Sequence, residues 1–235
     1  MIEKKERIAK KMADAGLCSR REAERWILAG RVVINGKKLT TPACVVGDED
    51  KILVDNKSLK IKEKTRVWIY HKPVGLVTTY HDPQGRPTVF EKLPKKMPRV
   101  ISVGRLDLNS EGLLLLTNDG EWARKMELPS SHLTRTYRVR VHGNLTGEVL
   151  SRLSKGVKIE GIQYAPAHIE IEKKQGTNTW IKMTLTEGKN REIRRLMAFF
   201  GLDVAKLIRI SYGPYELGNL KAGEVKEVPC VLFQA

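Results

Sequence analysis

Alternation of apolar and polar residues in the C-terminal half of the chain constrains its fold more than any other feature. The segments 136–142, 167–172 and 179–185 read TYRVRVH, AHIEIE and TWIKMTL. A period of two places the apolar side chains on one face of a β-strand. Sheets with one covered and one open face are usually antiparallel. These segments therefore predict strands of a largely antiparallel sheet.

One amphipathic helix and further strands accompany these segments. Over 190–200, apolar residues recur at i, i+3, i+4 and i+7, with Asn190 as the expected cap and Gly201 as the expected stop. Apolar runs at 67–70, 100–103 and 113–116 predict additional strands. Many strands with few helices indicate an α+β fold, with a mixed, largely antiparallel sheet flanked by helices.

The first third of the chain predicts a small domain of its own. A helix is expected over 3–15, and Ser19 with Glu22 forms a capping-box pattern at the start of a second helix. A hairpin follows, with Asn35-Gly36 as its tight turn. The polar, Lys-rich stretch 56–66 then reads as a linker or an exposed strand. We therefore expect two domains, at 1–62 and 63–235.

The charge of the chain points to a polyanionic partner. Lys and Arg number 43 against 27 Asp and Glu, a formal net charge of +16 over 235 residues. An anionic membrane surface would require a helix with one strongly apolar and one basic face, and the basic helices expected here have only short apolar faces. Nucleic acid is therefore favoured, and no membrane partner is expected.

Targeting signals and cysteine frameworks are missing from the sequence. No apolar run reaches the ~18 residues of a membrane span, and no apolar region follows the basic N-terminus as in a secretory signal. Cys18, Cys44 and Cys230 are widely spaced and form no Cys-x-x-Cys pair. A reduced, cytoplasmic location is expected.

Signatures of metal and cofactor chemistry are also missing. The sequence has no His-Glu-x-x-His, no paired Cys/His ligands, no Gly-x-x-x-x-Gly-Lys-Ser/Thr loop and no Gly-x-Gly-x-x-Gly after a strand. The deaminase pattern His-x-Glu with Pro-Cys-x-x-Cys is absent as well. We expect no metal and no cofactor, and chemistry that relies on a carboxylate, a tyrosine and basic groups.

Residues 5–55 resemble the S4 RNA-binding domain. The resemblance rests on SRREAERWILAGRVVINGK at 19–37, which combines a basic helix with the following hairpin. That family binds structured RNA with its basic helix–turn face. Any one of these basic residues could equally be a solvated surface charge, but the set favours RNA. The resemblance implies phosphate contacts by Ser19, Arg20, Arg21, Arg25, Arg31, Asn35 and Lys37.

A polar loop between two glycines carries the strongest functional signal. By composition alone, Asp107 in this loop reads as a turn former. However, GRLDLNSEGLLLLTNDG at 104–120 closely resembles the central motif of the RsuA/RluB-type pseudouridine synthases. The catalytic aspartate of that family falls on Asp107.

Other segments carry the same resemblance in the same order. They are HKPVG at 71–75, RTYRV at 135–139, EGKNREIRRLM at 187–197, and LIR at 207–209 followed by Tyr212-Gly213. The resemblance implies that Tyr137 is the active-site tyrosine and that Arg194 is the basic residue brought to Asp107. A role for Arg194 in a phosphate clamp stays open. Within that family, the sequence most closely resembles the RluB-like synthases of large-subunit ribosomal RNA.

The implied reaction needs no cofactor, because uridine becomes pseudouridine by breaking its N-glycosidic bond and re-forming the link at C5. A base inside an RNA helix must first leave the stack. Asp107 would then attack the sugar or remove a proton from it, and the sequence does not choose. Beside the flipped base, Leu207 and Ile193 would line the pocket, while Arg105 would fill the gap. RNA contacts are expected from Lys72, Lys189, Arg191 and Arg195.

We therefore expect an rRNA pseudouridine synthase, an isomerase acting on 23S ribosomal RNA or a ribosomal-subunit precursor, as a monomer. The alternative is a non-catalytic rRNA-binding or ribosome-assembly factor that keeps the fold. The joint presence of Asp107, Tyr137 and Arg194 argues against that alternative, because a factor without activity has no need for all of them.

Overall fold

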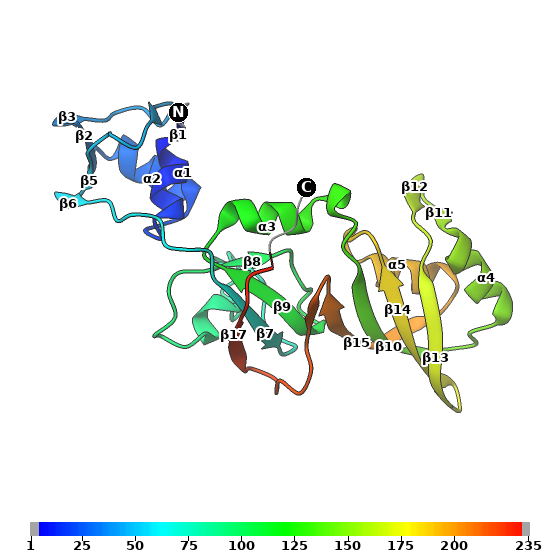
Figure 1. Cartoon of the computed structure of the whole chain (residues 1–235). Helices are drawn as coiled ribbons and strands as arrows, with labels where there is room; N and C mark the ends of the chain where they lie inside the picture. Colours follow the sequence, from blue (N-terminus) through cyan, green and yellow to red (C-terminus); the bar gives the residue numbers. More distant parts are fainter. Residues whose placement is uncertain (1–4, 232–235) are drawn as a thin grey trace. The chain divides into compact units, whose positions relative to one another are not determined.

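The computed structural model describes residues 5–231 and divides into two units (Figure 1). The first unit contains the chain up to Thr65 together with the segments Lys96–Ile101 and Asn118–Gly120. The second contains Arg66–Lys95, Ser102–Thr117 and the chain from Glu121 onward. Within residues 5–231, no helix has the length and apolar character needed to cross a bilayer.

The first unit packs two short helices against small sheets. Its elements are β1 (Glu6–Arg7), α1 (Ile8–Asp14), α2 (Arg20–Leu28), β2 (Val32–Ile34), β3 (Lys37–Lys38), β4 (Val45–Val46), β5 (Ile52–Val54) and β6 (Lys57–Ser58). A four-stranded sheet has the order β3-β2-β5-β6, and β1 pairs with β4. The core of this unit contains the buried side chains of Ile8, Met12, Ala23, Ile27 and Val32.

Local sequence signals account for the second helix and the hairpin. The predicted capping box is confirmed, because the Glu22 N–H donates to the Ser19 hydroxyl at 3.1 Å and the Ser19 N–H donates to the Glu22 carboxylate at 3.5 Å. Asn35 and Gly36 have φ angles of 49° and 80°, as the predicted tight turn requires.

The first helix is shorter than the sequence predicts. Residues 3 and 4 lie outside the described part of the chain, and α1 begins only at Ile8. The residues before it, Glu6–Arg7, pair instead with Val45–Val46 as a short antiparallel strand. Pairing with a distant segment overrides the helical preference of these residues, which a local pattern does not reveal.

The second unit is built on one nine-stranded sheet. Its path runs β13-β14-β10-β15-β9-β7-β17, with β16 paired to β15 and β8 to β9. The strands are β7 (Val67–Lys72), β8 (Ile101–Val103), β9 (Glu111–Thr117), β10 (Arg135–His142), β13 (His168–Gln175), β14 (Asn178–Leu185), β15 (Asp203–Tyr212), β16 (Tyr215–Glu216) and β17 (Val225–Val228). The strand β15 pairs with β9 in parallel, whereas β10–β14, β10–β15, β13–β14, β15–β16, β7–β17 and β7–β9 are antiparallel pairs. The predicted mixed, largely antiparallel α+β sheet is therefore confirmed.

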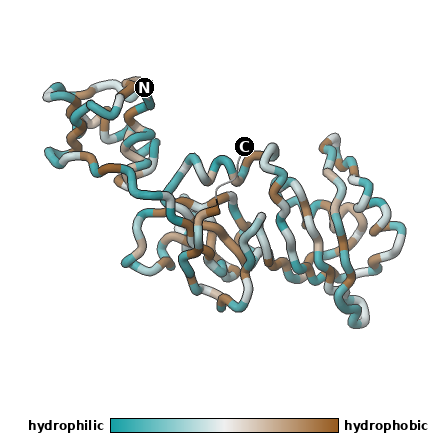
Figure 2. Tube along the Cα trace, in the orientation of Figure 1, coloured by the Kyte–Doolittle hydropathy of each residue, from teal (hydrophilic) through white to brown (hydrophobic). Residues whose placement is uncertain are grey.

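Helices and a small hairpin complete the second unit. They are α3 (Gly120–Glu127), α4 (Gly147–Lys155), α5 (Glu192–Phe199), the 3₁₀ turns at Phe90–Lys92 and Pro129–Ser131, and the strands β11 (Val157–Ile159) and β12 (Ile162–Tyr164). Alternation on β14 buries Thr179, Ile181, Met183 and Leu185. The central strand β9 instead buries Leu113–Leu116 on both faces, part of the brown hydrophobic interior in Figure 2.

The helix α5 begins at Glu192, and its cap is Arg191 rather than the predicted Asn190. Arg191 has a left-handed conformation with φ of 50°, and its side chain makes no capping hydrogen bond to the helix. The apolar residues Ile193, Leu196 and Met197 are buried as predicted and belong to a core shared with β10 and β14. This packing places α5 beside β15.

Candidate active site

An open cleft of about 1010 Å³ lies within the second unit. It is bordered by the loop after β7, the loop between β8 and β9, the strands β10 and β15, and the segment that leads into α5. All the residues predicted for catalysis and for the substrate pocket line this one cleft: Asp107, Tyr137, Arg194, Arg105, Ile193 and Leu207. The structure thus brings together side chains that are distant in the sequence.

The Asp107 loop is held in place from its buried side. The Lys72 ammonium donates to the carbonyls of Pro73, Asp107 and Ser110 at 3.0, 3.1 and 2.9 Å. The Thr78 hydroxyl donates to the Leu106 carbonyl at 2.9 Å. Since these bonds use backbone carbonyls, the loop has a defined shape while the Asp107 carboxylate stays about one-third exposed to the cleft.

Lys72 was predicted to contact RNA, and the structure shows that this prediction is wrong. Its side chain is fully buried at the end of β7, where RNA cannot reach it. Burial lowers the pKa of Lys72 to about 8, while the carboxylates of Asp107 and Glu111 act in the opposite direction. Its position after four buried strand residues could have indicated burial, but a lysine there reads first as a charge.

Gly112 lets the backbones of β9 and β15 lie close together behind the Asp107 loop. It lies opposite Arg209 in the parallel pair of β9 and β15 and has φ of 109°. A Cβ at this position would lie only 2.3 Å from the Arg209 carbonyl oxygen and 2.7 Å from its amide nitrogen. Only glycine therefore permits these two strands to meet here without a backbone shift.

Two arginines place positive charge beside Asp107. Arg191 Nη1 lies 3.4 Å from Asp107 Oδ2, and the Arg191 side chain is half exposed. Arg194 instead donates to the Asn109 carbonyl at 2.8 Å and to the Val204 carbonyl at 3.1 Å. Burial and the nearby Arg191 lower the pKa of Arg194, and the charge of Asp107 raises it. The family resemblance predicts Arg194 at the aspartate, whereas the ion pair with Asp107 is made by Arg191.

A buried polar cluster forms the floor of the cleft. Arg209, which faces Tyr137 across β15 and β10, donates from Nε to the Leu113 carbonyl at 2.7 Å. Arg135 donates from Nη2 to the Tyr212 hydroxyl at 2.9 Å, and that hydroxyl donates to the Met126 carbonyl at 2.9 Å. None of these contacts was predicted, although the alternation of Leu207 and Arg209 on one strand face indicates that Arg209 is buried.

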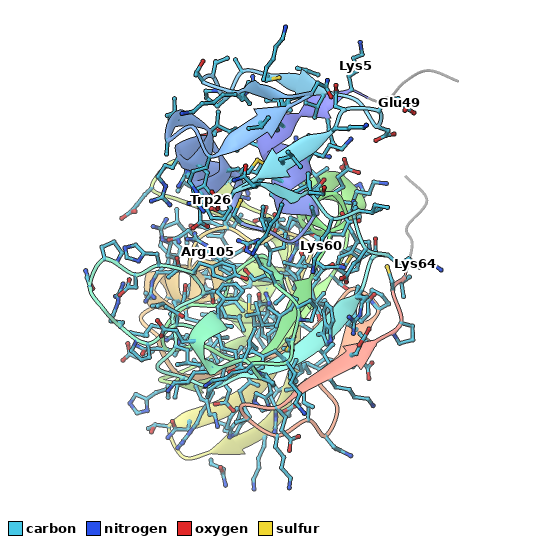
Figure 3. The ribbon with its side chains drawn as sticks, turned by 90° about the vertical axis from the view of Figure 1, so that its left-hand side faces the viewer. Lys5, Trp26, Glu49, Lys60, Lys64 and Arg105 are labelled. Atoms are coloured by element: carbon cyan, nitrogen blue, oxygen red, sulfur yellow. The ribbon has the colours of Figure 1, made fainter. Side chains whose placement is uncertain are left out.

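The residues expected to contact RNA near the cleft differ in exposure. Arg105, labelled in Figure 3, and Arg195 are exposed. Lys189 lines the cleft, but its ammonium is paired with Glu187. The Arg191 side chain is half exposed to solvent, and its guanidinium lies 3.4 Å from the Asp107 carboxylate. Arg105, Arg191 and Arg195 therefore carry the exposed positive charge among these residues.

In the first unit, the predicted RNA-contacting residues fall into two groups. Arg20, Arg21, Arg25 and Lys37 are exposed. The other group is engaged within the unit: the Ser19 hydroxyl caps α2, Arg31 is paired with Asp55 and lies over the Trp26 ring at 4.2 Å, and the Asn35 amide bonds Asp50 and the Lys51 N–H. Trp26 is labelled in Figure 3, as are Lys60 and Lys64, two exposed lysines of the polar stretch after β6.

Comparisons with known proteins agree along nearly the whole chain. The RNA pseudouridylate synthase family matches residues 66–199, and the S4 domain matches residues 6–52. An uncharacterized RNA pseudouridine synthase of Rickettsia bellii is 51% identical over 97% of this chain and 99% of its own length. Ribosomal large subunit pseudouridine synthase B of Salmonella typhimurium is 45% identical over 90% of this chain and 75% of its own length.

A solved structure supports the same similarity at the level of the fold. It is described as a pseudouridylate synthase and covers 95% of this chain and 96% of its own, with 26% identity and a TM-score of 0.67. The similarity therefore includes both the S4-like part and the part that contains the cleft.

Proposed function

The chain belongs to the RNA pseudouridylate synthase family, and from this premise we propose that it isomerises uridine in ribosomal RNA of the large subunit. The large-subunit choice is supported by relatives named for that activity, which are 44% and 45% identical to this chain. The observation that carries the proposal is the position of Asp107, on a braced loop within a cleft beside two arginines. Residues 63–235 form the catalytic domain in this proposal, and residues 1–62 the RNA-binding domain.

The reaction moves a bond within one nucleotide. The N1–C1′ glycosidic bond breaks and a C5–C1′ bond forms, after which the C5 proton leaves and N1 gains a proton. Nothing is oxidised and no group is imported. The Asp107 carboxylate either attacks the sugar or removes a proton from it, and both steps require the flipped uridine to enter the cleft.

The other cleft residues orient the uridine and the aspartate. Tyr137 offers a ring for stacking against the base, with a polar end that can accept or donate a hydrogen bond. Leu207 and Ile193, both buried, form the apolar side of the pocket. Arg194 holds the Asn109 carbonyl and places its charge near Asp107, and Arg105 occupies the space that the flipped base leaves in the RNA.

Binding is supplied mainly by phosphate contacts outside the cleft. In the first unit, Arg20, Arg21, Arg25 and Lys37 contact phosphates, while Ser19, Arg31 and Asn35 shape the surface that carries them. Near the cleft, Lys189, Arg191 and Arg195 extend the same path. The protein acts as a monomer, and a ribosomal RNA substrate places its activity in the cytoplasm.

Mapping of pseudouridine in ribosomal RNA tests the proposal. In vitro transcribed 23S and 16S RNA are incubated with the protein, and modified positions are located by carbodiimide-stop primer extension. We expect one or a few new stops in 23S RNA, without added metal cofactor or nucleotide. Tight binding of 23S RNA without any new stop would instead support the non-catalytic assembly factor. Stops confined to 16S RNA would contradict the large-subunit assignment.

A further inference from the structure

Two carboxyl groups meet beside the cleft, where the chain passes from β14 into α5. Glu192 is only 4% exposed, and its Oε2 accepts the Lys189 N–H at 2.9 Å. Its other oxygen, Oε1, is buried and finds no hydrogen-bond partner within residues 5–231. A buried carboxylate oxygen without a donor is costly, so this atom requires an explanation.

The neighbouring carboxyl group of Glu187 supplies that explanation. Glu187 Oε1 accepts the Ala165 N–H at 2.9 Å, and its Oε2 is paired with the Lys189 ammonium. The side chains of Glu187 and Glu192 are also within hydrogen-bonding reach of each other. Two ionised carboxylates can only accept, so a bond between them exists only when one carries a proton. A proton on Glu192 converts the unpartnered oxygen into a donor.

The surroundings assign this proton to Glu192. Burial, together with the hydrogen bond and charge of Glu187, raises the pKa of Glu192 to about 8, against the opposing effects of the Lys189 N–H and ammonium. Although burial acts to raise it, the pKa of Glu187 lies below its ordinary value because Lys189 and the Ala165 N–H donate to its carboxylate.

Few other charged groups face this pair. On β10, Arg135 lies against Gly188, with Nε 3.5 Å from where a Cβ would stand. From β12, the Tyr164 ring faces the Lys189 ammonium at 5.7 Å. Arg191 at the cap of α5 and Arg195 on the helix itself are exposed. When Glu187 and Glu192 share one proton, the single negative charge that remains is compensated by the Lys189 ammonium. The Arg135 guanidinium lies next to Gly188 of the same loop.

We propose that Glu192 carries a proton which it shares with Glu187, and that this bond positions the 187–191 loop for catalysis. The inference rests on the proposed function, because the loop ends at Arg191, whose guanidinium lies 3.4 Å from Asp107. With the proton removed, two adjacent negative charges repel and the loop loses its link between Glu187 and α5. Arg191, held at φ of 50°, then loses its orientation toward Asp107. Glu192 is a positioning residue that does not touch the substrate.

The pH profile of single-turnover pseudouridine formation tests this role. We expect the wild-type rate to fall above about pH 8, where Glu192 loses its proton. Glu192→Gln keeps a neutral group that donates to Glu187, so it retains the rate at neutral pH and loses the alkaline decline. At a pH one unit above the midpoint of the wild-type decline, the single-turnover rate of Glu192→Gln should exceed that of the wild type roughly tenfold. Glu192→Ala should lose about tenfold or more at every pH.

Glu148→Gln, on the exposed surface of α4, is the matched control and should follow the wild-type profile. An unchanged alkaline decline in Glu192→Gln would overturn the inference. Folded but inactive Glu192→Gln, with RNA binding intact, would overturn it as well, because a neutral amide should replace a neutral acid.

Infrared spectroscopy of the free protein tests the proton without any reaction. At pH 7 the wild type should show the carbonyl stretch of a protonated carboxylic acid, and Glu192→Gln should lack it. An active enzyme without this band would overturn the inference while the proposed function stands. A protein with the band but without pseudouridine formation would contradict the proposed function and support the shared proton.

Thermal unfolding gives a third measurement with a defined sign. The pKa of Glu192 is raised from 4.5 to about 8 on folding, so the native state holds an extra proton between these values. Wild-type stability from this group therefore declines as pH rises through that window. The melting temperature of Glu192→Gln relative to wild type should increase with pH there, and a constant difference would contradict the assignment.

Discussion

The two units use the same side chain, arginine, in opposite ways. On α2 of the first unit, Arg20, Arg21 and Arg25 are exposed. In the second unit, Arg135 and Arg209 are less than one-tenth exposed and donate to backbone carbonyls and to Tyr212 around the cleft. A guanidinium carries five N–H donors and stays charged, so it can either meet phosphates in water or brace several carbonyls when buried.

This difference separates residues that set RNA affinity from residues that set the shape of the cleft. In the proposed function, exposed cations of the first unit contribute to RNA binding through charge, which salt screens. Buried cations of the second unit shape the loops that carry Asp107 and Arg191, and salt has little access to them. Variants in the first unit should therefore change binding, and variants around the cleft should change the rate of the bound complex.

Among the variants that compare the two units, Lys72→Met should have the largest combined effect on stability and rate. This change leaves the carbonyls of Pro73, Asp107 and Ser110 buried without their shared donor, which should cost about 3 kcal/mol of unfolding free energy. Displacement of the Asp107 loop should lower the single-turnover rate by roughly a hundredfold. Urea denaturation and pseudouridine formation measure the two effects. Lys155→Met, an exposed lysine of α4, is the control and should change neither. If Lys72→Met weakened RNA binding alone, the bracing role would be refuted.

Effects on rate, without a comparable loss of stability, are expected within the arginine cluster at the start of α5. Arg194→Ala removes the donor to Asn109 and Val204 and should lower the rate by roughly a hundredfold, while Arg194→Lys should retain part of it. Arg191→Ala, which removes only a half-exposed contact with Asp107, should lower the rate about tenfold. Arg195→Ala should leave the rate of the bound complex nearly unchanged. A reversed order of Arg194 and Arg195 would show that the cluster is a phosphate clamp.

The smallest effect on rate is expected in the first unit. Combined replacement of Arg20, Arg21 and Arg25 by Ala should weaken RNA binding and reduce the salt slope of binding by roughly 2 to 3, one for each lost phosphate contact. The single-turnover rate at saturating protein should stay near wild type. Ser19→Ala is the comparison, since loss of its cap should destabilise the unit by about 1 kcal/mol without changing the slope. A triple variant with an unchanged slope would mean that RNA contacts other surfaces.

The sequence predicts local structure well wherever a local cause exists. The capping box at Ser19, the Asn35-Gly36 turn and the alternating strand β14 each follow from a few neighbouring residues. The predicted start of α1 is wrong because Glu6–Arg7 pair as a strand with Val45–Val46. The predicted cap of α5 is wrong because Arg191, in a left-handed backbone conformation, takes that position. Long-range pairing and left-handed residues other than glycine leave no reliable local pattern.

The site residues also divide into those that a local motif indicates and those whose role depends on long-range packing. A family motif indicated Asp107, Tyr137 and Arg194, and the structure places them in one cleft. The burial of Lys72 and the meeting of Glu187 with Glu192 depend on which strands and loops become neighbours in the sheet. Charged side chains in such positions look like surface residues in a sequence, so their bracing roles could not be predicted.

The most direct test of the account is Asp107→Asn, which keeps the size and polarity of the side chain and removes its negative charge. Tritium release from ribosomal RNA labelled at C5 of uridine measures turnover, and filter binding of the same variant measures RNA affinity. We expect turnover to fall by several orders of magnitude, out of the ~10⁶-fold or greater acceleration typical of enzymes, with affinity within about threefold of wild type because phosphate contacts dominate binding. Turnover within tenfold of wild type would contradict the assignment of Asp107 as the catalytic residue.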